Sequence, residues 1–517
     1  FSYWTFLAGA IMLKSSWFLG GAPNAGWFGY APITGEAYNP GHGIDFWIMS
    51  LQILGIASLA AAFNFVVTII NMRAPGMSLM RMPLFTWTSL CTAILMIFAM
   101  PPLTVATALL ALDRYLGFHF FTNALGGNMM HYANLFWMFG HPEVYIVILP
   151  AFGIYSEVVS TFSSKELYGY KSLVIATMAI AVLSFTVWLH HFFTMGQSAS
   201  INAAFGIATM AIGVPTGVKI YNWIWTMFRG EVRFTTPMIY ALAFMMTFVL
   251  GGLTGIILAF PPLDYIVHNT LFLVAHFHNM LIPGTLYGLL AAYTFWFPKV
   301  FGYRLDERWG RISCLCWIVG FYLAFMPLYV LGASGMARRT QAVMETAYRP
   351  WLYMAEAGAL ILLCAFAALI VQLWVSIRSR GANDVFVGDP WDGRALEWSV
   401  SAPPPEFNFA RLPHVDQAHW FYDAKRKYAP YAPPIAYHDI WMPRNSAVAP
   451  VIGIASGAAT FGLVWHMWWL AIFGLIVIFA AVVARSFVRD THRVIPASEV
   501  ARIDESWREA TARAQPV

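Results

Sequence analysis

Residues 130–150 read MHYANLFWMFGHPEVYIVILP, and residues 172–194 read SLVIATMAIAVLSFTVWLHHFFT. Each stretch is apolar enough to cross the hydrocarbon core of a bilayer, which takes about 20 residues of helix. Besides His131 at its start, the first stretch carries His141, and the second carries the pair His190–His191. Ionisable groups at this depth are costly, usually face the interior of a helix bundle, and serve a function. One such histidine could be a satisfied core residue, but three in neighbouring stretches favour a site.

The composition is that of a polytopic membrane protein. Of the 517 residues, 59% are hydrophobic and only 11% are charged, whereas about a quarter of the residues in a soluble domain are charged. The longest apolar run, 449–486, is too long for one span and breaks near His466. We therefore expect an all-α membrane helix bundle with about 12 transmembrane helices. The apolar runs are 3–20, 46–72, 85–112, 130–160, 172–195, 203–228, 237–260, 269–298, 311–335, 352–377 and 449–486.

The positive charges predict the orientation of the bundle. Lysine and arginine fall in every second loop, as in the pairs Lys165 with Lys171 and Arg229 with Arg233. By the positive-inside rule these loops and the polar segment 378–448 are cytoplasmic. We divide the chain accordingly. The parts are a transmembrane core at 1–377, a cytoplasmic loop at 378–448, two C-terminal transmembrane helices at 449–486 and a cytoplasmic tail at 487–517.

The central stretch combines a metal-binding pattern with groups that carry protons. His141 and Tyr145 are four residues apart, so their rings share one helical face. Glu143 points elsewhere, and a carboxylic acid in a membrane is able to hold and pass a proton near neutral pH. Together with His190 and His191, the first histidine offers three imidazoles, which suit copper, zinc or iron and, without thiolate or carboxylate, favour copper or zinc. The residues by themselves predict a three-histidine metal site beside a tyrosine and an acid.

Two further segments place polar groups inside spans. Thr216 and Lys219 lie one turn apart in PTGVKIYNW (215–223). A lysine there either reaches the interface or relays protons along a polar path, and its central position favours the relay. His276 and His278 are two residues apart, so their rings leave the helix on nearly opposite sides. They therefore cannot easily share one metal, but each could ligate the iron of a different haem.

In these motifs the chain resembles subunit I of the haem–copper terminal oxidases, and the resemblance covers essentially its whole length. The motifs are HPEVYI (141–146), WLHHFFTMG (188–196), PTGVKIYNW (215–223), AHFHNM (275–280) and MARRT (336–340). Within that superfamily, other segments are similar to the cytochrome bo-type ubiquinol oxidases more than to the cytochrome c oxidases. They are RAPGMSLMRMPLFTW (73–87), LDRYLGFHFFTNALGGNMM (112–130), DPWDGRALEWSVSAPPP (389–405), MPRNSA (442–447) and WHMWWLAIFG (465–474).

The resemblance implies which residues hold the metals. The implied ligands of copper B are His141, His190 and His191. Tyr145, covalently joined to His141, would donate an electron and a proton while the O–O bond is cleaved. His276 would ligate the high-spin haem (type O or A), and His278 would be one axial ligand of the low-spin haem B.

The resemblance also implies the proton paths and the haem surroundings. Glu143 would donate protons at the branch point of one path, and Lys219 with Thr216 would belong to a second. Arg338 and Arg339 stand in a loop predicted to lie outside the cytoplasm, where a solvated loop end is the ordinary explanation. In the family they would hold the haem propionates, to which the planar guanidinium is suited. The remaining residues expected near the cofactors are Trp137 and Trp188 beside copper and Asp264 and His268 on the propionate side.

We therefore expect the catalytic subunit of a proton-pumping ubiquinol oxidase in the bacterial inner membrane. It would oxidise ubiquinol, reduce O2 to water and pump protons, with subunits II, III and IV and membrane lipid as partners and with no nucleic acid. A cytochrome c oxidase is the first alternative. In the cytochrome c oxidases a His-Asp pair stands where this chain has His268–Asn269, so the magnesium site of that branch is doubtful here. A nitric oxide reductase is disfavoured by Tyr145 and Lys219. A proton channel or transporter without redox chemistry would need no haem ligands, and a non-catalytic assembly subunit would not need every ligand position filled.

The first residue, Phe1, is not methionine, and the chain opens directly into an apolar run. We therefore expect a piece of a longer chain. The second axial ligand of the low-spin haem, the entrance of the path to Glu143 and most of the quinol site would precede it.

Overall fold

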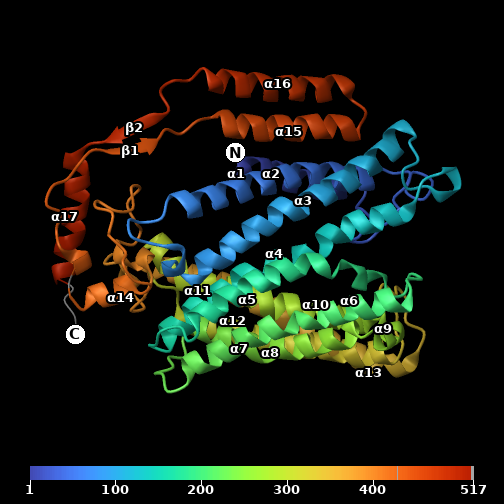
Figure 1. The fold of residues 1–517 in the computed structure, drawn as a ribbon, viewed down its shortest axis with the longest axis horizontal. Helices are drawn as coiled ribbons and strands as arrows, with labels where there is room; N and C mark the ends of the chain where they lie inside the picture. Colours follow the sequence, from blue (N-terminus) through green and yellow to red (C-terminus); the bar gives the residue numbers. More distant parts are fainter. Residues whose placement is uncertain (428, 514–517) are drawn as a thin grey trace. The chain divides into compact units, whose positions relative to one another are not determined.

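The structure is a computed structural model that describes residues 1–427 and 429–513 (Figure 1). Residue 428 of the expected cytoplasmic loop and residues 514–517 of the expected tail lie outside the described residues. The chain forms two compact units. Unit 1 consists of Phe1–Met72, Leu90–Ile146 and Trp441–Val494, and unit 2 of Arg73–Ser89, Val147–Ile440 and the C-terminal segment from Ile495.

Helices dominate both units, as the composition predicts. The α-helices are α1 (Ser2–Leu19), α2 (Gly43–Asn71), α3 (Leu84–Leu116), α4 (Met129–Phe162), α5 (Tyr170–Leu183), α6 (Ala199–Ala211), α7 (Gly213–Met227), α8 (Thr236–Ala259), α9 (Pro261–Val267), α10 (Leu271–Leu281), α11 (Tyr287–Phe301), α12 (Glu307–Ala333), α13 (Arg349–Arg378), α14 (Trp420–Lys425), α15 (Val448–Val464), α16 (Trp468–Ser486) and α17 (Ala497–Arg513). Helices α3 and α4 contribute to both units.

Short elements join or interrupt these helices. The 3₁₀ helices are η1 (Leu79–Arg81), η2 (Asn123–Leu125), η3 (Ser184–Thr186), η4 (Trp188–Phe192), η6 (Thr346–Tyr348), η7 (Arg380–Asn383), η8 (Leu396–Ser399) and η9 (Ala429–Tyr431). A single π-helical turn, η5 (Ile282–Leu286), separates α10 from α11. The strands β1 (Ile440–Pro443) and β2 (His492–Ile495) pair with each other.

The expected membrane helix bundle is confirmed. Ten helical stretches of the described chain are long and apolar enough to cross a membrane. Of the other two expected spans, 449–464 forms the shorter apolar helix α15, with 17 residues, and 3–20 forms the 18-residue helix α1, which is not among the ten. The apolar run 449–486 consists of α15 and α16, joined by a turn in which His466 has a φ of +54°.

In unit 1, helices α1, α2 and α15 pack together, and α16 packs along α15 (Figure 1). A buried ion pair joins the start of α2 to the end of α3, because Arg114 Nε donates to Asp45 Oδ1 at 2.6 Å. The same guanidinium also donates from Nη1 to the carbonyl oxygens of Thr34 and Asn39, at 2.7 and 2.9 Å. A buried pair is stable only when its remaining hydrogen-bonding capacity is satisfied in this way.

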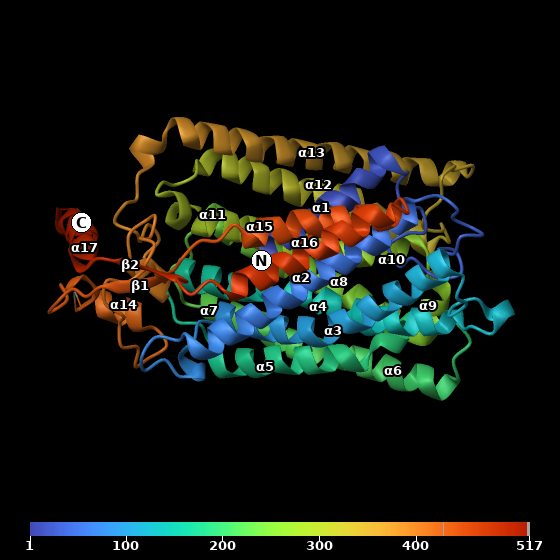
Figure 2. The same cartoon turned by 90° about the horizontal axis from the view of Figure 1, so that it is seen from above.

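In unit 2, helices α8, α10, α11 and α12 pack around one another, and α13 runs along α12 (Figure 2). The approach of α12 and α13 depends on Gly358, where an added Cβ would lie 2.2 Å from Ala324 N. Small residues at such crossings let membrane helices approach closely. This packing fixes α10, which carries the candidate haem ligands.

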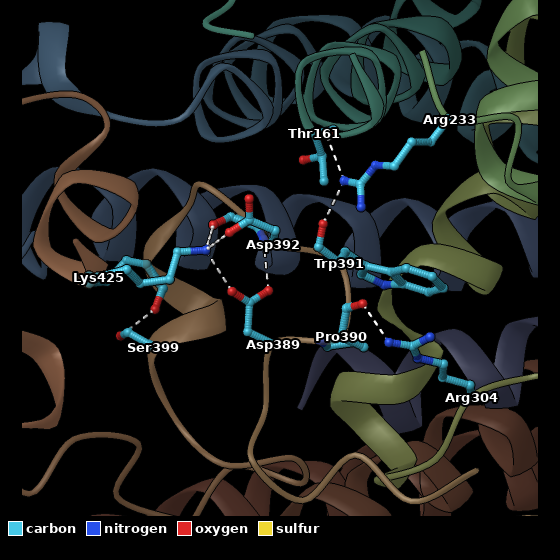
Figure 3. Close-up of polar contacts among 11 residues, drawn as sticks. Thr161, Arg233, Arg304, Asp389, Pro390, Trp391, Asp392, Ser399 and Lys425 are labelled. Atoms are coloured by element: carbon cyan, nitrogen blue, oxygen red, sulfur yellow. Dashed lines mark hydrogen bonds and ion pairs between the residues drawn. The ribbon is translucent and has the colours of Figure 1, made fainter. Parts of the chain in front are cut away.

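The segment that follows α13 is fastened to the ends of several unit 2 helices. Arg304 Nη2 donates to Pro390 O at 2.6 Å, and Arg233 Nη2 donates to Trp391 O at 2.8 Å and to Thr161 O at 3.1 Å (Figure 3). These bonds hold residues 390–391 against the end of α4 and the segments before α8 and α12.

Within that segment, Lys425 forms ion pairs with two aspartates. Its Nζ lies 2.7 Å from Asp389 Oδ2 and 2.6 Å from Asp392 Oδ1 (Figure 3). Asp389 also accepts from Gly393 N at 2.7 Å. The DPWDGR motif is thus a folded structural element, although its charged residues stand in a loop.

Candidate metal and haem centre

His141 and Tyr145 lie on one face of α4, as their spacing predicts. Their ring centroids are 4.7 Å apart, and His141 is buried with 7% of its surface exposed. Helix α4 continues through Pro142, so the turn that holds the two rings is regular helix. Glu143 is half-buried on the same helix, and its carboxyl makes no hydrogen bond within the described chain.

His190 and His191 come together because α5 ends before them. The chain passes from α5 through η3 into the 3₁₀ turn η4, and the two Nε2 atoms lie 3.1 Å apart. Two nitrogens bound at about 2.0 Å to one ion, about 100° apart, would be separated by about 3.1 Å. The pair therefore fits two ligands of a single metal ion.

The orientation of the His190 ring is set from α6. Thr209 Oγ1 donates to Phe205 O at 2.6 Å, so this oxygen accepts from His190 Nδ1 at 3.0 Å. Metal-binding histidines commonly donate their other ring N–H in this manner. The arrangement leaves Nε2 as the metal-facing nitrogen. Thr209 stands in no motif, so this role was not predictable from the sequence.

His276 and His278 have different surroundings, as two residues on opposite sides of a helix should. His276 Nδ1 lies 3.1 Å from Gly251 O on α8, whereas His278 Nδ1 donates to Val274 O within α10 at 2.8 Å. The His278 ring stacks on Phe325 of α12, with centroids 4.5 Å apart. Each ring thus uses Nδ1 for the protein and retains Nε2 for an iron.

Gly255 provides the space beside the His276 ring. A Cβ at this position would lie 2.9 Å from His276 Cε1, which is closer than carbon atoms normally approach. The absence of a side chain therefore leaves a cradle for the imidazole, as a haem ligand fixed from α8 would require. No motif in the sequence marks this glycine.

Asp264, His268 and the arginine pair are gathered near the start of α10. His268 Nδ1 lies 2.9 Å from Asp264 Oδ2. Arg338 N donates to Asn269 O at 2.9 Å, and Thr270 and Ala337 form an antiparallel bridge. These backbone bonds hold Arg338 and Arg339 beside the ligand helix, and the Arg338 guanidinium lies 5.7 Å from the centre of the Phe277 ring.

Lys219 is completely buried in α7 and bonds to α5. Its Nζ donates to Thr177 Oγ1 at 2.5 Å and lies 3.3 Å from Leu173 O. Thr216, one turn earlier, donates to Ile212 O of its own helix at 2.9 Å. The lysine therefore does not reach towards the membrane surface, and Thr177 is a hydroxyl partner that sequence reasoning missed.

The two tryptophans have separate partners. Trp137 Nε1 donates to the Tyr30 hydroxyl in unit 1, and Trp188 packs edge-to-face on Phe205 in unit 2, with ring centroids 5.5 Å apart. Their expected place near copper stays a prediction.

Comparison with known proteins identifies the family. Residues 1–361 match the family model described as Cytochrome C and Quinol oxidase polypeptide I. The chain is 51% identical to a probable cytochrome c oxidase subunit 1 of Bradyrhizobium diazoefficiens, over 97% of this chain and 76% of the relative. It is 48% identical to ubiquinol oxidase subunit 1 of Acetobacter aceti, over 99% of this chain and 78% of the relative.

A solved structure supports the fold. It is a haem–copper terminal oxidase dimer, matched with a TM-score of 0.62 and 18% identity over 99% of this chain and 83% of that chain. The chain belongs to the family of cytochrome c and quinol oxidase subunit I.

Membership and structure together confirm several predictions. The chain is an oxidoreductase subunit of the terminal oxidase type and a multi-pass protein of the bacterial inner membrane. Subunit I of this family carries a high-spin haem, a low-spin haem and copper B. It works within an oxidase of several subunits.

Proposed function

We propose that this chain is the catalytic subunit of a proton-pumping ubiquinol oxidase, with copper B bound by His141, His190 and His191. The observation that carries the proposal is the 3.1 Å separation of the His190 and His191 Nε2 atoms. Both of these nitrogens belong to unit 2, and the family resemblance supplies His141 as the third imidazole. An all-imidazole donor set suits copper.

The haem irons take their ligands from α10. His276 serves the high-spin haem, of type O or A, and His278 serves the low-spin haem B. In support, Nδ1 of each ring lies within hydrogen-bonding distance of a backbone carbonyl oxygen, and the two rings have different neighbours. Arg338 and Arg339 would hold the haem propionates, with Asp264 and His268 on the same side at the start of α10.

The metals, when bound, would pass electrons taken from quinol to O2 and coordinate it while it is reduced to water. The protein residues supply protons and orientation. Tyr145, whose ring centre lies 4.7 Å from that of His141, would provide a hydroxyl proton and, as the family resemblance implies, be covalently joined to that ring. Glu143 passes protons along one path. Lys219 and Thr216 belong to the second path, in which the Lys219 ammonium holds a proton against Thr177 Oγ1.

The electron donor is a quinol. Several relatives that match nearly the whole chain are named as quinol oxidases, among them those of Acetobacter aceti and Bacillus subtilis. Asn269 after His268 agrees with this donor. Subunits II, III and IV complete the enzyme, with ubiquinol and O2 as substrates.

A cytochrome c oxidase is the second candidate, because the Bradyrhizobium diazoefficiens relative at 51% identity carries that name. The two candidates differ in donor and in copper content. Oxygen uptake by the purified complex should be driven by ubiquinol and not by reduced cytochrome c, with one copper per pair of haems. Uptake driven by cytochrome c, together with additional copper, would replace the first candidate by the second.

A further inference from the structure

A chain of hydroxyl groups leads away from His276. Besides the Gly251 carbonyl oxygen, His276 Nδ1 has a second neighbour, Thr254 Oγ1, at 3.0 Å. Thr254 is buried on α8, one turn from Gly251. The Thr254 oxygen lies in turn 2.9 Å from the hydroxyl of Tyr329 on α12. Three helices thus meet at the ring N–H of one candidate ligand.

The far end of this chain is held by Asn279. With the amide oxygen of Asn279 turned towards α8 and α12, this oxygen accepts from Gly251 N and from the Tyr329 hydroxyl, both at 3.1 Å. The amide nitrogen then donates to Thr247 O at 3.2 Å. All polar atoms of Asn279 are satisfied in this orientation, and the Tyr329 ring is held edge-to-face against Phe272 at 5.0 Å.

These partners set the roles of the two hydroxyl groups. Since Tyr329 donates its proton to Asn279, its oxygen is left as an acceptor for Thr254 Oγ1, whose proton also lies within reach of Gly251 O at 2.8 Å. Thr254 in turn presents a lone pair to the His276 N–H. Bonds that point the same way along a chain strengthen one another in a low-dielectric interior. Without the Tyr329 hydroxyl, the Thr254 proton would have Gly251 O as its remaining acceptor, and Thr254 would compete fully with His276 for that oxygen.

We propose that Tyr329 and Thr254 are positioning residues that set the strength of the hydrogen bond at His276 Nδ1, and thereby the properties of the iron that His276 ligates. The proposal rests on the proposed role of His276 as a haem ligand. A stronger acceptor at Nδ1 makes the imidazole a better electron donor, which strengthens the iron–nitrogen bond and favours oxidised iron.

The other candidate ligand, His278, has a backbone acceptor at Nδ1 in place of a side-chain hydroxyl. His278 Nδ1 donates to Val274 O, a backbone acceptor of its own helix, at 2.8 Å. The hydroxyl chain therefore acts on one haem only. The low-spin haem is an internal reference in every sample.

The chain offers a matched control seven residues away. Tyr322 lies two turns before Tyr329 on α12, and its hydroxyl lies 3.0 Å from Thr247 Oγ1, which is itself two turns before Thr254 on α8. Tyr322→Phe removes the same hydroxyl group from the same pair of helices. It does so without touching the bonds of His276.

The test is resonance Raman spectroscopy of the reduced, full oxidase complex, together with redox titration of both haems. Tyr329→Phe should shift the iron–histidine stretching band to lower frequency and raise the midpoint potential of the CO-binding haem. The low-spin haem should be unchanged, and Tyr322→Phe should match the unaltered enzyme in both measurements. Thr254→Val should reproduce the Tyr329→Phe shift, and Thr254→Ser, which keeps the hydroxyl, should restore the band.

A band that is the same in Tyr329→Phe and Tyr322→Phe would overturn the proposal. If Tyr329→Phe does not assemble, Thr254→Val compared with Thr254→Ser decides in the same way. The proposed function fails by a different result, namely a His276→Ala complex that retains the CO-binding haem and its iron–histidine band.

Discussion

Replacement of Gly255 by alanine should displace the haem ligand His276. The new Cβ would lie 2.9 Å from His276 Cε1, whereas carbon atoms in contact are about 3.5–4.0 Å apart. The ring or α8 must therefore move by about 0.6–1 Å, more than the roughly 0.5 Å within which a functional site must be held. Overpacking of this kind costs about 1–3 kcal/mol, which corresponds to about 5- to 150-fold weaker retention of the haem if His276 holds its iron.

The assay is haem content and the carbon monoxide difference spectrum of the purified complex. Gly255→Ala should lose or shift the CO-reactive signal and keep the low-spin haem. Gly252→Ala is the matched control, because a Cβ there meets no atom within 4 Å and alanine is the better helix former by about 1 kcal/mol. If the Gly255→Ala complex has the same CO signal as the Gly252→Ala complex, His276 does not need the space that Gly255 leaves.

Three other substitutions test separate parts of the structure. Thr177→Val removes the hydroxyl bonded to Lys219. It should slow reduction of the CO-binding haem about tenfold, because it removes the free energy of one hydrogen bond to a charged group. An unchanged rate of haem reduction in stopped-flow measurements would contradict this. Asp45→Asn leaves Arg114 buried without its counter-charge and should destabilise the complex by about 3 kcal/mol in thermal inactivation, so an unaltered half-life would count against the pair. Burial raises the pKa of Glu397. A group with a raised pKa stabilises the fold below the ordinary glutamate pKa, and this stability is lost as pH rises through the raised pKa. Glu397→Gln should therefore reduce the fall of Tm with rising pH, and parallel curves of Tm against pH for the two proteins would exclude this.

The helical fold was predictable because an apolar run of about twenty residues in a membrane must satisfy its own backbone hydrogen bonds, and an α-helix does this. The shared face of His141 and Tyr145 followed from helical periodicity, and so did the separation of His276 from His278. These inferences are local, since each depends on residues within one or two turns.

The partners contributed by other helices were not predictable. Thr177 lies 42 residues from Lys219, and Tyr329 lies 75 residues from Thr254. Hydroxyl side chains are common in membrane helices, where most of them bond to their own backbone, as Thr216 does. Only the packing of α5 on α7 and of α8 on α12 selects the ones that reach a functional group. The meeting of the His190 and His191 nitrogens likewise depends on the change from α-helix to 3₁₀ turn at Leu183, which periodicity does not signal.

The most direct test of the central claim is the metal content of the purified oxidase complex, measured with its carbon monoxide difference spectrum. The unaltered complex should contain one copper and two haems, one of which binds carbon monoxide. Replacement of His191 by alanine should remove the copper and leave both haems. A complex without copper, or a His191→Ala complex that retains its copper in full, would contradict the assignment of His141, His190 and His191 as the copper ligands.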